Sequence, residues 1–290
     1  MRILDRINEP FPTISFEIFP PKTTAGIDSV LQAAGKIAAL SPDYISVTYG
    51  AGGGRSRYTA RIAGELQKSS GIPVLAHLTC VTQSRESLIE TVREYQRLGI
   101  ENILALRGDF PKDRPAETDF MHASDLVAEL HELGDFCIGG ACYPEGHVES
   151  AHKSEDIRHL KEKVDAGTDF LTTQMFFDNN IYYNFLYRVR EIGIRVPILP
   201  GIMPITTAAQ LQRSVEMSGT NVPERFRAIV DYFGENPAAM KQAGIVYASE
   251  QIIDLLANGI THIHVYSMNK PDVAEGILRN LSDILQRKDG

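Results

Sequence analysis

Tryptophan is absent from this chain of 290 residues, and cysteine occurs only three times. Without an indole ring, stacking against a flat ligand falls to tyrosine, phenylalanine or histidine side chains. Cys80, Cys137 and Cys142 form no C-x-x-C pair, so the chain has neither a zinc ribbon nor a disulfide framework. Cysteine usage of this kind predicts a reducing, cytoplasmic compartment.

An excess of positive charge is also missing, because the net charge is −8 at pH 7. A surface for nucleic acid or for an anionic membrane would carry clustered positive charge, so we expect neither partner. No apolar run reaches the roughly 18 residues of a membrane span. The first residues, MRILDR, contain no apolar signal core. We therefore expect a cytoplasmic protein that acts on small molecules.

Three common catalytic signatures do not occur. The segment GAGGG at residues 50–54 lacks the spacing of the dinucleotide fingerprint G-x-G-x-x-G. The chain contains no G-x-x-x-x-G-K-[ST] phosphate loop and no G-x-S-x-G nucleophile elbow. These absences exclude a Rossmann domain, a P-loop nucleotidase and a serine hydrolase of the elbow type.

The segment TISFEIFPPK at residues 13–22 organises what is present. Its β-branched and aromatic residues predict a short strand, which the two prolines must end. Strand alternation places Glu17 on one face with Ser15 and Phe19, and the apolar residues between them on the other. A carboxylate in such a strand must be paired, exposed at the strand end or shifted toward its neutral form. An ordinary acid at a strand end is the simplest interpretation of Glu17 taken alone.

Apolar strand patterns alternate with helical patterns along the chain. Eight such pairs without a break in composition predict a single TIM (β/α)8 barrel over residues 1–290, with extra helices at residues 223–258. A doubly wound sheet also alternates strands and helices, but it rarely needs eight equal units. The predicted strands span residues 14–19, 44–48, 74–78, 102–106, 137–141, 170–173, 198–199 and 260–266. The predicted helices span residues 25–40, 59–68, 123–133, 152–166, 181–192, 208–217 and 274–285, with one more between its N-cap Ser84 and Gly99.

The chemistry of such a barrel lies at the C-terminal ends of the strands. Side chains at or just beyond these ends are Glu17, Thr48, His77, Asp109, Tyr143, Gln174 and Tyr266. His262 and His264 share one strand face and, with His77, suggest a metal site, although barrel-interior histidines are the more common arrangement. The residues alone predict a barrel enzyme with an acid–base pair, Glu17 and Asp109, and they leave the substrate open.

Seven motifs follow one another at the strand ends: SFEIFPPK (15–22), VTYGA (47–51), AHLTC (76–80), LALRGD (104–109), YPEGH (143–147), KVDAG (163–167) and TQMFFD (173–178). In this order they resemble the methylenetetrahydrofolate reductase family, in its bacterial, FAD-dependent form. The resemblance covers essentially the whole chain. It implies a TIM-barrel flavoprotein that takes hydride from NADH or NADPH onto FAD. The hydride then passes to 5,10-methylenetetrahydrofolate, giving 5-methyltetrahydrofolate for methionine synthesis and one-carbon metabolism.

The resemblance also implies roles for the two carboxylates. Glu17 matches the family's general acid, since opening the methylene bridge makes a nitrogen the leaving group, and that nitrogen needs a proton. An apolar strand favours the protonated form of a glutamic acid. Asp109 follows Arg107 and Gly108 and is expected to stay ionised near the flavin and the pterin, where its charge eases hydride donation. A plain ion pair between Arg107 and Asp109 is the structural alternative.

The other expected contacts follow from the same match. The expected FAD contacts are Thr48, Tyr49, Ala51, His77, Arg107, Gly108, Asp109, Ala123, Tyr143, His147, Asp156 and Lys163. The expected folate contacts are Asp109, Gln174, Gln210 and Lys270, and no metal ligand is expected. Arg107 and Lys163 would meet pyrophosphate charge, and the amide of Gln174 offers a donor and an acceptor to a heterocycle edge.

Some positions depart from the family pattern. Ser214 stands where many bacterial members carry an aromatic residue, and Phe176 and Phe177 are not expected to replace that ring. Glu162 stands where a basic residue often meets the flavin nucleotide. Lys270 replaces an arginine that often meets the folate glutamate tail, so the charge is kept but the bidentate fork is lost.

The resemblance leaves larger questions as expectations. We expect a catalytic barrel without the S-adenosylmethionine-binding regulatory domain of longer members, NADH as the nucleotide, and a homo-oligomer. Two alternatives stay open. One is a metal-dependent lyase on the same barrel, for which His262 and His264 would be the clue. The other is a non-catalytic flavin-binding component of a complex.

Overall fold

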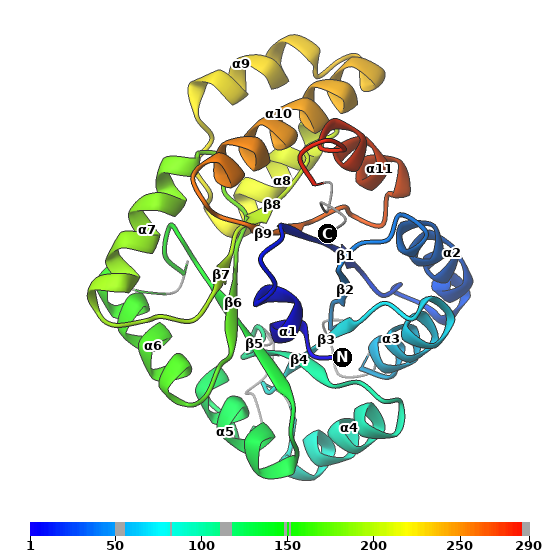
Figure 1. The fold of residues 1–290 in the computed structure, drawn as a ribbon, viewed down its shortest axis with the longest axis vertical. Helices are drawn as coiled ribbons and strands as arrows, with labels where there is room; N and C mark the ends of the chain where they lie inside the picture. The colour runs from blue at the N-terminus through cyan, green and yellow to red at the C-terminus, as the bar shows by residue number, and fades with distance from the viewer. Residues whose placement is uncertain (50–55, 82, 111–117, 148–149, 151, 286–290) are drawn as a thin grey trace.

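A single sheet of parallel strands curves into a nearly closed barrel with helices around it (Figure 1). The computed structural model describes residues 1–290 except 50–55, 82, 111–117, 148–149, 151 and 286–290. The strand order is β7-β6-β5-β4-β3-β2-β1-β9-β8, which confirms the predicted single TIM-type barrel. The strands are β1 (Thr13–Ile18), β2 (Tyr44–Val47), β3 (Val74–Thr79), β4 (Asn102–Leu106), β5 (Cys137–Cys142), β6 (Phe170–Thr173), β7 (Ile198–Leu199), β8 (Gly201–Ile202) and β9 (His262–Val265).

The helices follow the predicted order, and Ser84 caps its helix by accepting the Ser87 N–H as expected. The predicted insertion at residues 223–258 holds two helices, α9 and α10. No helix in the described part of the chain is long and apolar enough to cross a bilayer. The helices are α1 (Ile3–Ile7), α2 (Ile27–Ala38), α3 (Ser56–Ser70), α4 (Arg85–Arg97), α5 (Ala123–Leu133), α6 (Lys153–Asp165), α7 (Asn179–Glu191), α8 (Ala208–Ser218), α9 (Glu224–Phe233), α10 (Pro237–Ala257) and α11 (Pro271–Asn280), with a 3-10 turn at Thr24–Gly26.

The seventh strand, predicted at residues 198–199, is β7, and the structure adds the short strand β8 after Pro200, which was not predicted. Proline has no N–H for the ladder. As a result β7 pairs with β6, and β8 pairs with β9 on the other side of the seam. The N–H of Gly201 instead donates to the side-chain oxygen of Thr173 at 2.9 Å. A Cβ at Gly201 would lie 2.4 Å from the Thr173 carbonyl oxygen, so only glycine allows this approach.

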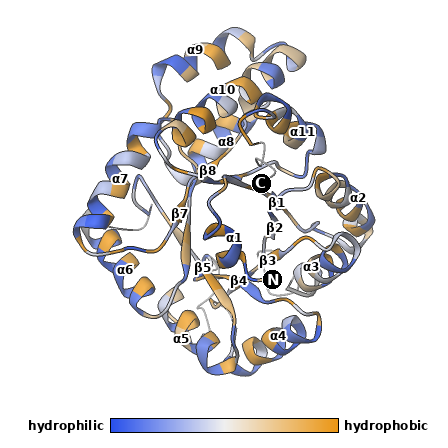
Figure 2. Cartoon of the chain, in the orientation of Figure 1, coloured by the Kyte–Doolittle hydropathy of each residue, from blue (hydrophilic) through white to orange (hydrophobic). Residues whose placement is uncertain are grey.

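The main core lies between the barrel and the helices. Outward-facing strand residues such as Phe16, Ile18 and Ile103 are fully buried against apolar helix faces. Helices that bury one face against the barrel must be amphipathic, and Figure 2 shows both hydrophobic and hydrophilic residues along the surrounding helices. Burial on both faces explains why the strands read as apolar runs in the sequence.

The sequence analysis did not predict α1, whose five residues are too few for a periodic signal. In Figure 1 this helix lies inside the ring of strands. Ile3 and Ile7 pack there with Leu75, Leu104 and Phe170, and so close the end of the barrel opposite the catalytic end. The buried amide of Asn102 fixes the segment, because it accepts the Ile3 N–H at 2.8 Å. The same amide donates to Met1 O at 3.2 Å and to Val74 O at 3.3 Å.

We expect Asn102→Ala to lower the free energy of unfolding by about 1–3 kcal/mol, because it leaves buried backbone groups without partners. The midpoint and slope of urea unfolding measure this change. Asn184→Ala is the matched control: Asn184 is exposed and bonds only Asn180 O within its own helix, so a change of at most ~0.5 kcal/mol is expected. Equal stability of the two variants would mean that α1 adds nothing to the fold.

Candidate active site

A cavity of about 680 Å³ opens at the C-terminal ends of the strands. This is the size of an ordinary small-molecule site and the end of the barrel where such sites lie. Residues from β1, β2, β3, β4, β5, β6 and β9 line it, together with α8 and the loop before it. Of the residues predicted for the site, those that line the cavity are Glu17, Thr48, His77, Asp109, Tyr143, His147, Gln174, Gln210 and Lys270.

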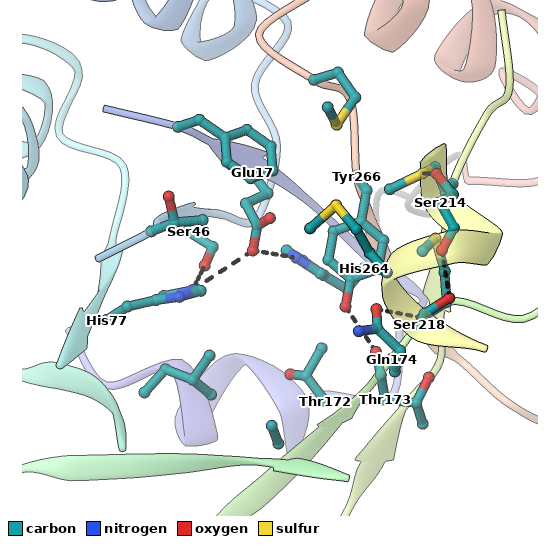
Figure 3. Close-up of a pocket in the computed structure, with 18 of the residues that line it drawn as sticks. Glu17, Ser46, His77, Thr172, Thr173, Gln174, Ser214, Ser218, His264 and Tyr266 are labelled. Carbon is teal, nitrogen blue, oxygen red and sulfur yellow. Dashed lines mark hydrogen bonds and ion pairs between the residues drawn. The ribbon is translucent and has the colours of Figure 1, made fainter. Parts of the chain in front are cut away.

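Glu17 is the buried acid of this cavity, with 6% of its surface exposed. Its Oε2 lies 3.6 Å from Nε2 of His77 and 3.6 Å from Nε2 of His264. Figure 3 shows the carboxyl group between the two rings. Parallel pairing explains the arrangement, because β1 lies between β2 and β9, which is the strand that carries His264. The alternation predicted for β1 therefore holds: Glu17 faces the cavity, and Phe16 and Ile18 face the helices.

Each histidine is also held by a serine. Ser46 Oγ lies 2.6 Å from Nε2 of His77, and Ser15 Oγ lies 2.8 Å from Nδ1 of His264. Burial lowers the pKa of His77 to about 4, against the opposing effect of Glu17 and with a further lowering by His264. His77 is consequently neutral at physiological pH. The carboxyl group of Glu17 has no imidazolium at His77 to hold it in the ionised form.

Tyr266 and Thr173 form the wall across the seam of the barrel. The Tyr266 hydroxyl donates to Thr173 O at 2.7 Å, and the Tyr266 ring meets the His264 ring edge-to-face at 5.0 Å between centroids. Burial raises the pKa of Tyr266, so the hydroxyl stays a donor. Gln174 follows directly, with its Oε1 accepting the Met175 N–H at 3.0 Å. These contacts fix the amide of Gln174 at the rim of the cavity.

The ends of β4 and β5 lie on the other side. Asp109 is exposed at the cavity. The turn before it needs glycine, because Gly108 has φ +83° and a Cβ there would lie 2.8 Å from Val81. Tyr143 and His147 meet edge-to-face at 4.6 Å between ring centroids. Burial, followed by the charges of Asp156 and Asp109, raises the pKa of Tyr143 to about 12.

The loop between β8 and α8 carries the remaining polar residues. Lys270 Nζ donates to Thr206 Oγ1 at 2.7 Å. Gln210 Oε1 accepts from both the N–H and the hydroxyl of Thr206 at 3.0 Å, and its Nε2 donates to Pro204 O at 3.3 Å. The loop sits directly on α10, where a Cβ at Gly244 would lie 1.6 Å from Ile205 O. The ammonium group of Lys270 is thus held at the cavity by a rigid loop.

A family model described as Methylenetetrahydrofolate reductase matches residues 2–282. The chain belongs to the methylenetetrahydrofolate reductase family. It is 36% identical to the 5,10-methylenetetrahydrofolate reductase of Pectobacterium carotovorum subsp. carotovorum over 268 residues, which cover 92% of this chain and 89% of that protein. The protein is therefore an oxidoreductase enzyme, as the resemblance of its motifs predicted.

A plant relative and a solved structure extend the comparison. Methylenetetrahydrofolate reductase (NADH) 1 of Zea mays is 35% identical over 302 residues, which cover 99% of this chain and 51% of that protein. The chain thus spans about half the length of the plant relative. An uncharacterized protein from Clostridium thermocellum that binds two copies of 5-methyl-5,6,7,8-tetrahydrofolic acid aligns over 98% of this chain and 99% of its own, with a TM-score of 0.67. At 15% identity it shows the common fold alone.

Several residues matched to the reductase family's cofactor contacts lie near the cavity but do not line it. Ala51 is outside the described residues. Those described but not lining are Tyr49, Arg107, Gly108, Ala123, Asp156 and Lys163. The Tyr49 hydroxyl accepts from Gln83 at 2.7 Å. Lys163 Nζ donates to Ala141 O at 2.7 Å, and burial lowers the pKa of Lys163. Tyr49, Arg107 and Gly108 follow the ends of β2 and β4, and Lys163 contacts β5.

A group of cavity residues escaped the sequence analysis. Methionine side chains line the part of the cavity near Ser214, whose Oγ lies 3.4 Å from the sulfur of Met203. The methionines are Met175, Met203, Met217 and Met268. Phe176 and Phe177 are fully buried outside the cavity, as expected. Flexible thioethers therefore occupy the region where reductases often have an aromatic ring.

His262 does not join the two histidines at Glu17. Its Nδ1 lies 3.1 Å from Thr13 Oγ1, and the residue does not line the cavity. Among the described residues, no group of three or more His, Cys, Asp or Glu side chains is arranged to hold a metal ion. Of the two histidines on β9, His264 lines the cavity and His262 lies outside it.

The low pKa of His77 predicts a pH-dependent stability. Between pH 6.5 and about 4 the unfolded chain binds a proton at this position and the folded protein does not, so stability falls as pH falls through this range. We expect the stability advantage of wild type over His77→Gln to shrink by on the order of 3 kcal/mol from pH 7 to pH 4. Urea unfolding at several pH values measures it. A difference that stays constant over this pH range would mean that the His77 ring takes up its proton in the fold as it does in the unfolded chain.

Proposed function

We propose that this barrel reduces 5,10-methylenetetrahydrofolate to 5-methyltetrahydrofolate with FAD and NADH, in two half-reactions at the one cavity. The observation that carries the proposal is the buried carboxyl group of Glu17, placed between His77 and His264 in a chain of the reductase family. NADH is favoured because it stands in the name of the maize relative. The product would supply methyl groups for methionine synthesis.

The residues at the ends of β2 to β5 fit a flavin nucleotide. Arg107 and Lys163 lie at the ends of β4 and β5 but do not line the cavity, so a pyrophosphate would reach them only if Lys163 exchanged its bond to Ala141 O for the phosphate. The rings of Tyr143 and His147 form one wall of the cavity there. When bound there, FAD supplies a carrier that accepts hydride from the nucleotide and gives it to the folate.

The other half of the cavity fits a folate. The amide of Gln174 has a donor and an acceptor for the pterin edge, and the exposed carboxylate of Asp109 faces the same space. The ammonium group of Lys270 can meet a carboxylate of the glutamate tail. Gln210 contributes chiefly by holding the loop that carries Thr206, since its amide is bonded within the chain. The methionines near Ser214 offer an apolar, adaptable surface for the aromatic middle of the substrate.

Glu17 supplies the proton of the folate half-reaction. The C–N bond of the methylene bridge breaks as the carboxyl group protonates the departing nitrogen, which leaves a carbon able to accept hydride. Glu17 is buried beside the neutral ring of His77, and in this proposal its protonated carboxyl group serves the step. Asp109 lies at the exposed edge of the same cavity, where the proposal places the flavin and the pterin.

Glu17→Gln tests the role of the acid. Gln keeps the size of the side chain but has no proton to give. We expect NADH to reduce the bound flavin at close to the wild-type rate, and methylenetetrahydrofolate to reoxidise it about 10²–10⁴-fold more slowly. Stopped-flow absorbance measures each half-reaction. Glu90→Gln, at an exposed position of α4, is the control. Equal slowing of both halves would show that Glu17 positions the cofactor instead.

The visible spectrum of the purified protein tests the cofactor and the alternatives. We expect the absorption bands of oxidised flavin and a flavin-to-protein ratio near one. Elemental analysis of the same sample separates the lyase alternative, for which a stoichiometric metal without flavin is the signature. A yellow protein that fails to reduce a folate would support the non-catalytic flavin-binding component.

A further inference from the structure

Ser15 and His264 form a cross-strand pair directly beside Glu17. Ser15 Oγ donates to Ile263 O at 3.3 Å and lies 2.8 Å from Nδ1 of His264. A serine hydroxyl has one proton, and a carbonyl oxygen can only accept. With its proton on Ile263 O, Ser15 receives the N–H of Nδ1. The neutral ring then presents the lone pair of Nε2, the atom that faces Glu17 Oε2 at 3.6 Å.

His77 is less suited to this task, although it lies at the same distance from Glu17. The atom of His77 nearest to Glu17 is Nε2, and that same atom is already bonded to Ser46 at 2.6 Å. In His264 the two ring nitrogens are divided, Nδ1 to Ser15 and Nε2 to Glu17. A rotation of the carboxyl group that shortens 3.6 Å by less than 1 Å completes a hydrogen bond. Such bonds are often long before the substrate is bound.

We propose that Ser15 selects the Nδ1–H tautomer of His264, so that Nε2 accepts the hydrogen bond of protonated Glu17 and keeps that carboxyl group ready as the acid. His264 and Ser15 are positioning residues here, and no proton leaves either of them. The proton that reaches the folate nitrogen is the one Glu17 carries. This inference rests on the proposed function and assigns one step of it to a tautomer.

The other titratable groups that interact with Glu17 carry no charge at physiological pH. Tyr44 on β2 and Tyr266 after β9 interact electrostatically with Glu17, and burial raises the pKa of both tyrosines, so both are neutral. His77 on β3 is neutral for the reason given above. His264 contacts Glu17 directly, and the tautomer of the ring decides whether Nε2 accepts a hydrogen bond from the carboxyl group or donates one to it.

Ser15→Ala tests the inference because it removes the hydroxyl that receives the Nδ1 proton. The ring is then free to place its proton on Nε2 and to donate to the Glu17 carboxylate, which favours the ionised form. We expect the folate half-reaction to slow by about tenfold, with a greater loss at higher pH. The NADH half-reaction should be unchanged. Ser15→Thr keeps the hydroxyl and should restore the wild-type profile.

A matched control lies two residues earlier on both β1 and β9. Thr13 and His262 occupy the same cross-strand register as Ser15 and His264, with Thr13 Oγ1 3.1 Å from His262 Nδ1, and neither lines the cavity. Thr13→Val removes the equivalent hydroxyl and should leave the pH profile of the folate half-reaction as it is. A shift equal to that of Ser15→Ala would overturn the inference, because loosening of the strand pair would then explain both.

Nitrogen NMR of histidine-labelled protein reads the tautomer without any folate. The His264 signal is assigned as the one missing from His264→Gln. We expect an Nδ1–H ring in wild type and in Ser15→Thr, and an Nε2–H ring in Ser15→Ala. An unchanged tautomer in an active Ser15→Ala protein overturns this inference alone. A wild-type protein that binds flavin yet never reduces methylenetetrahydrofolate overturns the proposed function, and the catalytic role of the tautomer with it.

Discussion

The parallel pairing of β1 with β9 is the contact on which the rest of the structure depends. It joins two strands some 250 positions apart in the chain, with Ser15 opposite His264 in register. A shift of one residue in this ladder would turn Glu17 toward the helices and an isoleucine or phenylalanine into the cavity. The fold and the acid are therefore fixed by the same hydrogen bonds, and the apolar layer around Phe16 and Ile18 holds the register.

Much of the architecture follows from patterns that depend on local physics. Apolar runs, helix caps and strand-ending prolines gave the barrel, the place of the inserted helices and the face on which Glu17 lies. The seventh strand was predicted to end before Pro200, which cannot donate to the ladder, but the short strand β8 beyond it was missed. The seam also needed Gly201 and the side chain of Thr173, whose meeting depends on a neighbouring strand. The five-residue helix α1 gave no periodic signal at all.

In the site, too, features that depend on local sequence could be predicted, and those that depend on contacts between distant segments could not. Residues at strand ends, such as His77 and Tyr143, could be named because a barrel places such ends together. Arg107 and Lys163 were matched to a ligand, yet Lys163 is bonded to Ala141 O and neither lines the cavity. The methionines near Ser214 were missed because, in a sequence alone, a methionine is normally interpreted as a residue of the hydrophobic core. The low pKa of His77 needed the three-dimensional burial of its ring, which no spacing reveals.

The pairing of β1 with β9 has a consequence for synthesis on the ribosome. About 250 residues separate β1 from β9, so at ~5–20 residues per second the first strand waits roughly 10–50 s for its partner. During that time one edge of β1 has no neighbour, and an apolar strand with an open edge is a template for pairing with other chains. The length of chain between the two strands, more than the stability of the finished barrel, sets how long that edge stays open.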